Sequence, residues 1–213
     1  MAKVTQSNLT TGISSGTGAT TSSVSPVPNQ IVIVTVLAFN NSTSPNTPTL
    51  SGCSITWNQI VTEATTQRNV TSFVGVSSSP TAGVLTISFG GQSEGAIQWS
   101  VDQFANTRIS NGGLDAIVQN NKKQSTSTGS PFTVTLSAFA NINNATYGAI
   151  QLSANTPSTN MTSIFTTGSS NWAWSNANQT SVSWTFSGTV LATAIAFEIA
   201  FGLQGGFMEI LSI

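Results

Sequence analysis

The residues able to carry out acid–base chemistry are few and scattered along the chain. There is no histidine, so the usual base of a nucleophilic triad is missing. The carboxylates are Glu63, Glu94, Asp102, Asp115, Glu198 and Glu209. A glycosidase needs two carboxyl groups about 5–10 Å apart. Glu94 and Asp102 flank one expected strand and could approach other acids in space, but nothing in their context indicates a raised pKa. We therefore expect no catalytic residue and a protein that is not an enzyme.

Few residues could bind a metal ion or a phosphate group. Cys53 is the only cysteine, which excludes an intramolecular disulfide and a thiolate cluster. It lies in SGCSITW at the start of an expected strand, which favours a buried structural thiol. Calcium stays an alternative because Asn, Asp and backbone oxygens can bind it, although no DxDxDG-like cluster exists. The pieces FGGQSEG and ISNGGLD lack a following lysine or helix and predict turns. No cofactor is predicted.

The five tryptophans are the better candidates for binding, since their rings can stack on sugars while Asn side chains bond the hydroxyls. Three of them share the apolar phase of alternating segments and are expected in the core: Trp57, Trp99 and Trp184. Trp172 and Trp174 differ, because their segment SSNWAWSNAN is polar and would project both rings from one face. With Asn171 and Asn176 they form the candidate binding or subunit contact; a small satellite core is the alternative.

The segments that would position these residues all alternate with period 2, and none shows a helical stripe. Expected strands include NQIVIVTVLAF, SITWNQIV, VTSFVGV, VLTISFG, AIQWSVDQF, PFTVTLSAF, YGAIQLSA and VSWTFSG. Between Val190 and Leu203, large and small residues alternate, which predicts a strand that is buried on one face and closely covered on the other. The stretch is too short for a membrane helix. The fold class is all-β: a two-sheet antiparallel β-sandwich, jelly-roll-like, with an extended N-terminal arm.

Composition shifts divide the chain into three parts. Residues 1–28 are a Ser/Thr/Gly tract expected to be an extended arm, residues 29–205 the sandwich, and residues 206–213 an apolar tail. Three similar strand pairs recur, over 84–104, 132–154 and 182–200. They are either independent hairpins with common strand chemistry or a sign of duplicated sheet architecture. The start MAKVTQSNLTTG has no apolar signal region, so synthesis and folding in a host cytoplasm are expected.

Charge is the scarcest property of this chain. It carries 5 Lys and Arg and 6 Asp and Glu, 5% of its residues, against about 25% in an average chain. Uncharged Ser, Thr, Asn and Gln fill 95 of 213 positions. Because the chain has no excess of Lys and Arg over Asp and Glu, nucleic acid and anionic membranes are excluded as partners. Isolated β-proteins guard their sheet edges with charge. We therefore expect surfaces that are covered in a symmetric assembly, a trimer or a lattice.

The ordered pattern over about 29–200 resembles a group of jelly-roll proteins and modules from tailed phages and bacterial surfaces. The resemblance rests on NQIVIVTVLAF, ITWNQIV, GVLTISFGG, IQWSVDQFANT and ATAIAFEIA. It implies a structural or adhesive role, and it carries no catalytic motif. We therefore expect a non-enzymatic virion protein of the capsid decoration or cement type, whose partners are its own copies and another virion protein. The alternatives are a carbohydrate-binding adhesin or phage tail-fibre receptor-binding subunit, and a self-assembling surface filament subunit.

Overall fold

The computed structural model describes residues 3–202 and confirms the all-β class, with antiparallel sheets packed as a sandwich. The expected tail 206–213 lies outside the described residues. The first eight strands are β1 (Thr5–Gly16), β2 (Gly18–Thr20), β3 (Ile31–Phe39), β4 (Thr49–Gly52), β5 (Asn58–Ala64), β6 (Arg68–Gly75), β7 (Leu85–Ser88) and β8 (Glu94–Ala105). After the short helix η1 (Asn111–Ala116) come β9 (Ile117–Thr128), β10 (Phe132–Thr135), β11 (Ala145–Leu152), β12 (Ser158–Thr159), β13 (Thr162–Thr167), β14 (Ser170–Ser175), β15 (Ser181–Thr185) and β16 (Val190–Ile199).

The two groups of eight strands have the same topology. The first forms a five-stranded sheet in the order β1-β8-β3-β6-β5 and a three-stranded sheet β2-β7-β4. The second forms β9-β16-β11-β14-β13 and β10-β15-β12. Adding eight to every strand number of the first half reproduces the second. The chain therefore contains two copies of one eight-strand arrangement, and η1 connects them. We expected a single sandwich over 29–205.

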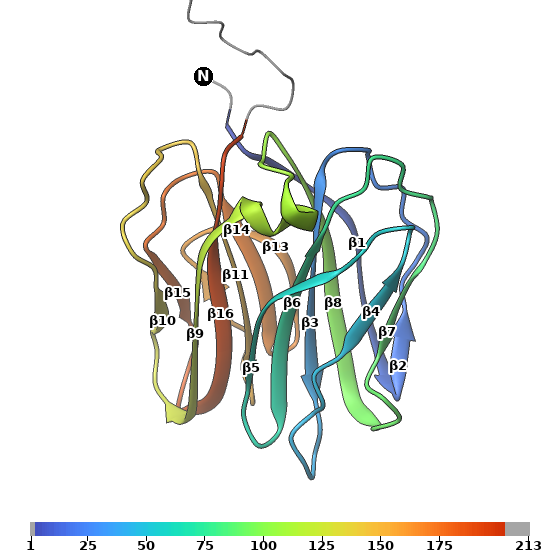
Figure 1. Cartoon of the computed structure of the whole chain (residues 1–213). Helices are drawn as coiled ribbons and strands as arrows, with labels where there is room; N and C mark the ends of the chain where they lie inside the picture. The colour runs from blue at the N-terminus through green and yellow to red at the C-terminus, as the bar shows by residue number, and fades with distance from the viewer. Residues whose placement is uncertain (1–2, 203–213) are drawn as a thin grey trace, which may run out of the picture.

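The four sheets stack in layers, visible side by side in Figure 1 with the small sheets outermost. One hydrophobic core lies between the two five-stranded sheets and is shared by both halves. Each half has a second core between its own large and small sheets. Both large sheets are thus covered on both faces, which explains why β3 and β11 are apolar or buried along their whole length.

Strand β16 shows how the sequence pattern creates these layers. Ile195, Phe197 and Ile199 point into the core between the large sheets. The alternate alanines, among them Ala194 and Ala196, face the small sheet of the second half. The expectation for this segment, one face of large residues and one closely covered face of small ones, is confirmed.

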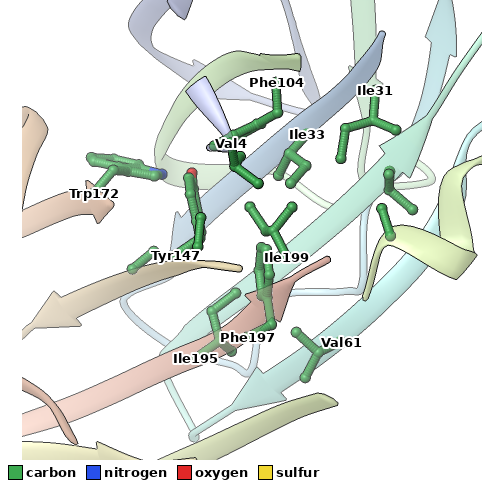
Figure 2. Close-up of a cluster of buried hydrophobic side chains, with 14 of the residues drawn as sticks. Val4, Ile31, Ile33, Val61, Phe104, Tyr147, Trp172, Ile195, Phe197 and Ile199 are labelled. Carbon is green, nitrogen blue, oxygen red and sulfur yellow. The ribbon is translucent and has the colours of Figure 1, made fainter. Parts of the chain in front are cut away.

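The shared core joins the halves through aromatic side chains as well as aliphatic ones (Figure 2). Tyr147 of β11 meets Phe104 of β8 edge-on across the two sheets, with 6.2 Å between ring centroids. Trp172 of β14 donates its indole N–H to the carbonyl oxygen of Thr35 in β3, at 3.3 Å. That bond crosses from the second large sheet to the first, so it fixes the two sheets to one another.

The structure places the expected N-terminal arm inside the fold. Strand β1 pairs antiparallel with β8 from Thr5 to Gly16 and forms the edge of the first large sheet. Val4 is fully buried in the core between the large sheets, and Val24 is buried in the core of the first half. A polar tract can form such a strand because an edge position needs few apolar side chains and the ladder with β8 supplies its backbone partners. Residues 117–128, which none of the expected strands covers, form the equivalent edge strand β9.

Candidate interaction surface

The four candidate binding residues lie on or just after β14, and the structure separates them by depth. Trp172 has no exposed surface and Asn171 is buried. Trp174 is half-buried and contacts Phe104 edge-on, with 6.3 Å between ring centroids. Asn176 is exposed. The two tryptophans do share one face, as expected, but that face is turned toward the core between the large sheets.

Asn171 has a structural task. Its side-chain oxygen accepts the indole N–H of Trp184 at 3.0 Å. Its amide nitrogen donates to the hydroxyls of Ser163 and Thr166, both at 2.8 Å. Asn171 therefore ties the core of the second half to edge strand β13. The expected core positions of Trp99 and Trp184 are confirmed, and Trp57 is half-buried against the first-half core.

Asp102 is the centre of a buried polar cluster between the large sheets. Its Oδ1 accepts from the amides of Gln6 and Asn8 at 2.8 and 2.9 Å. Its Oδ2 accepts from the hydroxyls of Ser100 and Tyr147 at 2.7 and 3.2 Å. Burial raises the pKa of Asp102, while the bonds from Asn8, Ser100, Gln6 and Tyr147 oppose that rise. Burial and the charge of Asp102 also raise the pKa of Tyr147. The raised pKa of Asp102 was not expected from its sequence context.

The other two buried acids, Glu94 and Glu198, accept hydrogen bonds from neutral partners of their own. Glu94 accepts from the amide of Asn40 at 3.0 Å, and burial raises its pKa. Glu198 accepts from Gln119 at 2.7 Å and from Asn144. Glu94 and Asp102 are eight residues apart on β8, about 26 Å along an extended strand. That separation exceeds what a pair of glycosidase carboxyls requires.

Cys53 is buried in the first-half core, as expected for a structural thiol. Its Sγ lies 3.6 Å from the carbonyl oxygen of Gly83. Burial raises the thiol pKa, which lowers the fraction of reactive thiolate.

The outer surface carries few charges because the fold buries several of the few charged side chains that the chain contains. Of the ten charged residues within 3–202, four are buried: Arg68, Glu94, Asp102 and Glu198. The other six are Lys3, Glu63, Arg108, Asp115, Lys122 and Lys123. The accessible surface of the whole molecule is 9093 Å², so these six charged residues are thinly spread over it.

The remaining charge is distributed unevenly between the two lateral sides of the stack. On one side edge strand β5 packs beside edge strand β9, nearest the viewer in Figure 1. There Lys122 donates to Glu63 Oε2 and to the carbonyl oxygen of Thr62, each at 2.9 Å, and Lys123 lies next to it. The opposite lateral side carries the edge strands β1 and β13, and neither contains a charged residue.

This side, the β1/β13 side, has Lys3 just before β1, donating to the carbonyl oxygen of Asn176 at 3.4 Å, and it also exposes apolar surface. Ile13 of β1 is 56% exposed. Where β1 turns into β2, a shallow hollow is lined by neutral residues that include Ser14, Thr17, Thr20 and Thr86. Charged side chains protect sheet edges against pairing with other chains. The β1/β13 side lacks that protection and is the candidate interaction surface.

Comparison with known proteins assigns no role to this surface. No protein-family model matches the sequence, and no curated protein is significantly similar to it. Within residues 3–202 no three Asp, Glu, Cys or His side chains gather as metal ligands. No helix in that part of the chain has the length and apolar character needed to cross a bilayer.

Sequence reasoning singled out neither of the strands that form this surface. β1 lies in the tract taken as an arm, and β13 (TSIFTT) was not recognised as a strand. The usable signal was the density of Thr, a β-branched residue, in both segments. Arg68 was also missed, although RNVTSFVG places it in the same phase as Val70 and Val74.

Proposed function

We propose that this protein is a non-enzymatic structural component of a virion, of the capsid decoration type. It would assemble through non-covalent contacts with its own copies and with another virion protein. The observation that carries the proposal is the β1/β13 side, where neither the 12-residue edge strand β1 nor β13 contains a charged side chain. The jelly-roll resemblance, with which the strand order of each half is consistent, supplies the virion context.

A neutral edge strand suits permanent assembly for two physical reasons. Its free backbone N–H and C=O groups can accept a strand from a neighbouring chain, which provides a ladder of hydrogen bonds. Hydroxyl and amide side chains can then pair across the contact without the desolvation cost that ions incur. Ile13, already more than half exposed, offers apolar area at the centre of such a contact.

The adhesin alternative depended on a platform of Trp172 and Trp174. Trp172 has no exposed surface, so the two rings do not form a platform in this conformation. Trp174 and Asn176 remain near the surface, but no observation favours them as a sugar site over the β1/β13 side. The surface filament subunit would use the same edge strands, and localisation of the protein separates it from a virion component.

The assembly step is tested by placing one charge on each lateral side of the stack. Ile13→Lys puts a charge on β1, and Val118→Lys puts the same charge on β9, where Val118 is 48% exposed. We expect the unchanged protein and Val118→Lys to sediment as the same oligomer, and Ile13→Lys to shift toward monomer. A stable monomer of the unchanged protein at high concentration would contradict self-assembly.

The location is tested by electron microscopy of particles from the native source, labelled with an antibody against the chain. We expect regularly spaced label on the outside of virions. Label on cell-surface filaments would favour the filament subunit, and label confined to the tail tip would favour a receptor-binding subunit.

A further inference from the structure

Arg68 is a buried cation in the first residue of β6. Its side chain is 5% exposed, and its position in the strand turns it, with Val70 and Val74, toward the second large sheet. The guanidinium carbon lies 4.7 Å from the centroid of the Phe39 ring. Nε donates to the carbonyl oxygen of Leu152 at 3.1 Å. Nη1 is buried and has no hydrogen-bond partner among residues 3–202.

Within residues 3–202, no carboxylate forms an ion pair with this charge. The ion pair recorded within residues 3–202 joins Lys122 to Glu63, at the β5/β9 side. Glu94, Asp102 and Glu198 are engaged with neutral donors, as described above. Burial lowers the pKa of Arg68, and no acidic neighbour within the described part of the chain opposes that effect. An unpaired buried charge is strongly unfavourable, so a missing counter-charge is the simplest account of this position.

The second large sheet presents three further unsatisfied side chains at the same end of the interface. Gln151 of β11 pairs in register with Ser170 of β14 and with Thr193 of β16, which puts the three side by side. Their phase matches that of Trp172 and Ile195, so they face the first sheet. Gln151 Oε1, Ser170 Oγ and Thr193 Oγ1 are buried, and none of them has a hydrogen-bond partner in the part of the chain that the structure describes. The bond from Arg68 to Leu152, the neighbour of Gln151, brings the guanidinium to this group.

We propose that Arg68, Ser170, Thr193 and Gln151 bind one small monovalent inorganic anion of the size of chloride. The N–H of Arg68 Nη1 and the hydroxyls of Ser170 and Thr193 donate to it. Rotation of the Gln151 amide by 180° exchanges its oxygen for nitrogen and supplies a further donor. A water molecule would satisfy the hydrogen bonds but not the charge. Because these side chains are at most 5% exposed, a ligand among them would be a single ion and not a chain segment.

The site has a consequence for the whole molecule. The cation comes from the first half and the three polar side chains come from the second. The anion therefore links the duplicated halves across their shared core. Because the anion binds the folded chain only, it raises the stability of that chain in proportion to the logarithm of its concentration above the dissociation constant.

The first experiment measures thermal unfolding of the full chain in sodium chloride and in sodium gluconate at constant ionic strength. We expect the midpoint to rise by about 3–5 °C for each tenfold increase in chloride above the dissociation constant. The double variant Ser170→Ala, Thr193→Val keeps the volume and loses two donors, so its chloride dependence should fall. Arg68→Met should lose that dependence entirely. Lys122→Gln, which removes an exposed cation, should keep it and so controls for general screening.

The second experiment needs no variant. Crystals of the unchanged protein are grown with sodium bromide, and anomalous scattering is measured at the bromine edge. One ordered peak within hydrogen-bonding distance of Arg68 Nη1 is the expected result. If no peak is found there, or if chloride stabilises the unchanged protein and the double variant equally, the space holds water and the proposal is overturned.

Discussion

Asp102 accepts four hydrogen bonds from neutral donors while it is completely buried, so its effect on stability depends on pH. Burial raises its pKa in the folded state above the value of about 3.9 for an unfolded chain. The folded protein therefore binds the proton more tightly than the unfolded chain does. The stability from this group is fully present below about pH 3.9. It is lost as the pH rises through the folded-state pKa.

Asp102→Asn should flatten that dependence, since the amide stays neutral and the hydroxyls of Ser100 and Tyr147 can rotate to suit it. Urea denaturation between pH 4 and pH 8 gives the free energy of unfolding for both proteins. A tenfold difference in proton affinity is worth about 1.4 kcal/mol. Glu94, whose pKa burial also raises, contributes in the same direction and should leave a residual slope in the variant. An unfolding free energy that rises with pH in the unchanged protein would contradict the assignment.

Two tryptophans on one strand should differ sharply in their contribution to stability. Trp172→Ala removes a fully buried ring between the large sheets and its bond to Thr35, so we expect a loss of about 3–5 kcal/mol. Trp174→Ala removes a half-buried ring and should cost clearly less. Urea unfolding measures both variants. If the two variants lost the same unfolding free energy, Trp172 and Trp174 would be buried to the same extent in solution, which would contradict the structure.

The sequence placed these two rings on one face, because alternation is local, but it did not show which way that face points. The segment is polar around them, and burial comes from β3 and β8 of the other half, about a hundred residues away. No local pattern records that contact. Arg68 is the converse case, because its phase with Val70 and Val74 is readable in the sequence and indicates burial, yet it was missed as a functional residue.

At the scale of the elements, β1 should prove to be an integral part of the first sheet. Removal of residues 1–16 exposes the ladder edge of β8 and takes Val4 out of the shared core. It also uncovers Trp99, whose ring lies against Gly12 with no room for a side chain there. We expect a lower urea midpoint and faster aggregation. If the shortened protein kept the urea midpoint of the full chain, residues 1–16 would be an arm that the fold does not need.

Strands buried on both faces were predictable from the sequence, and polar edge strands were not. NQIVIVTVLAF contains β3 as expected, because a run of β-branched apolar residues that is too short for a long helix fits few other structures. β1 and β9 hold the same place in each half and were both missed, because an edge strand half open to water needs little apolar periodicity. Hydrogen bonding to a neighbour decides their structure.

At the scale of the whole molecule, the shared core should make the two halves unfold together. That core takes side chains from both large sheets, so neither half covers its own inner face. The three similar strand pairs in the sequence hinted at duplicated sheets. They did not show that the large sheets would pack against each other, because that choice rests on contacts between distant segments.

Val182→Ala tests this coupling in the intact chain. Val182 is fully buried in the core that belongs to the second half alone, and its truncation should cost about 2 kcal/mol. If unfolding is cooperative, amide hydrogen exchange at Leu85 and Ile87, in the outer sheet of the first half, should accelerate by about the factor that this cost implies, roughly 30-fold. Exchange there that stays unchanged, while amides of β15 accelerate, would mean that each duplicated half is an independent folding unit.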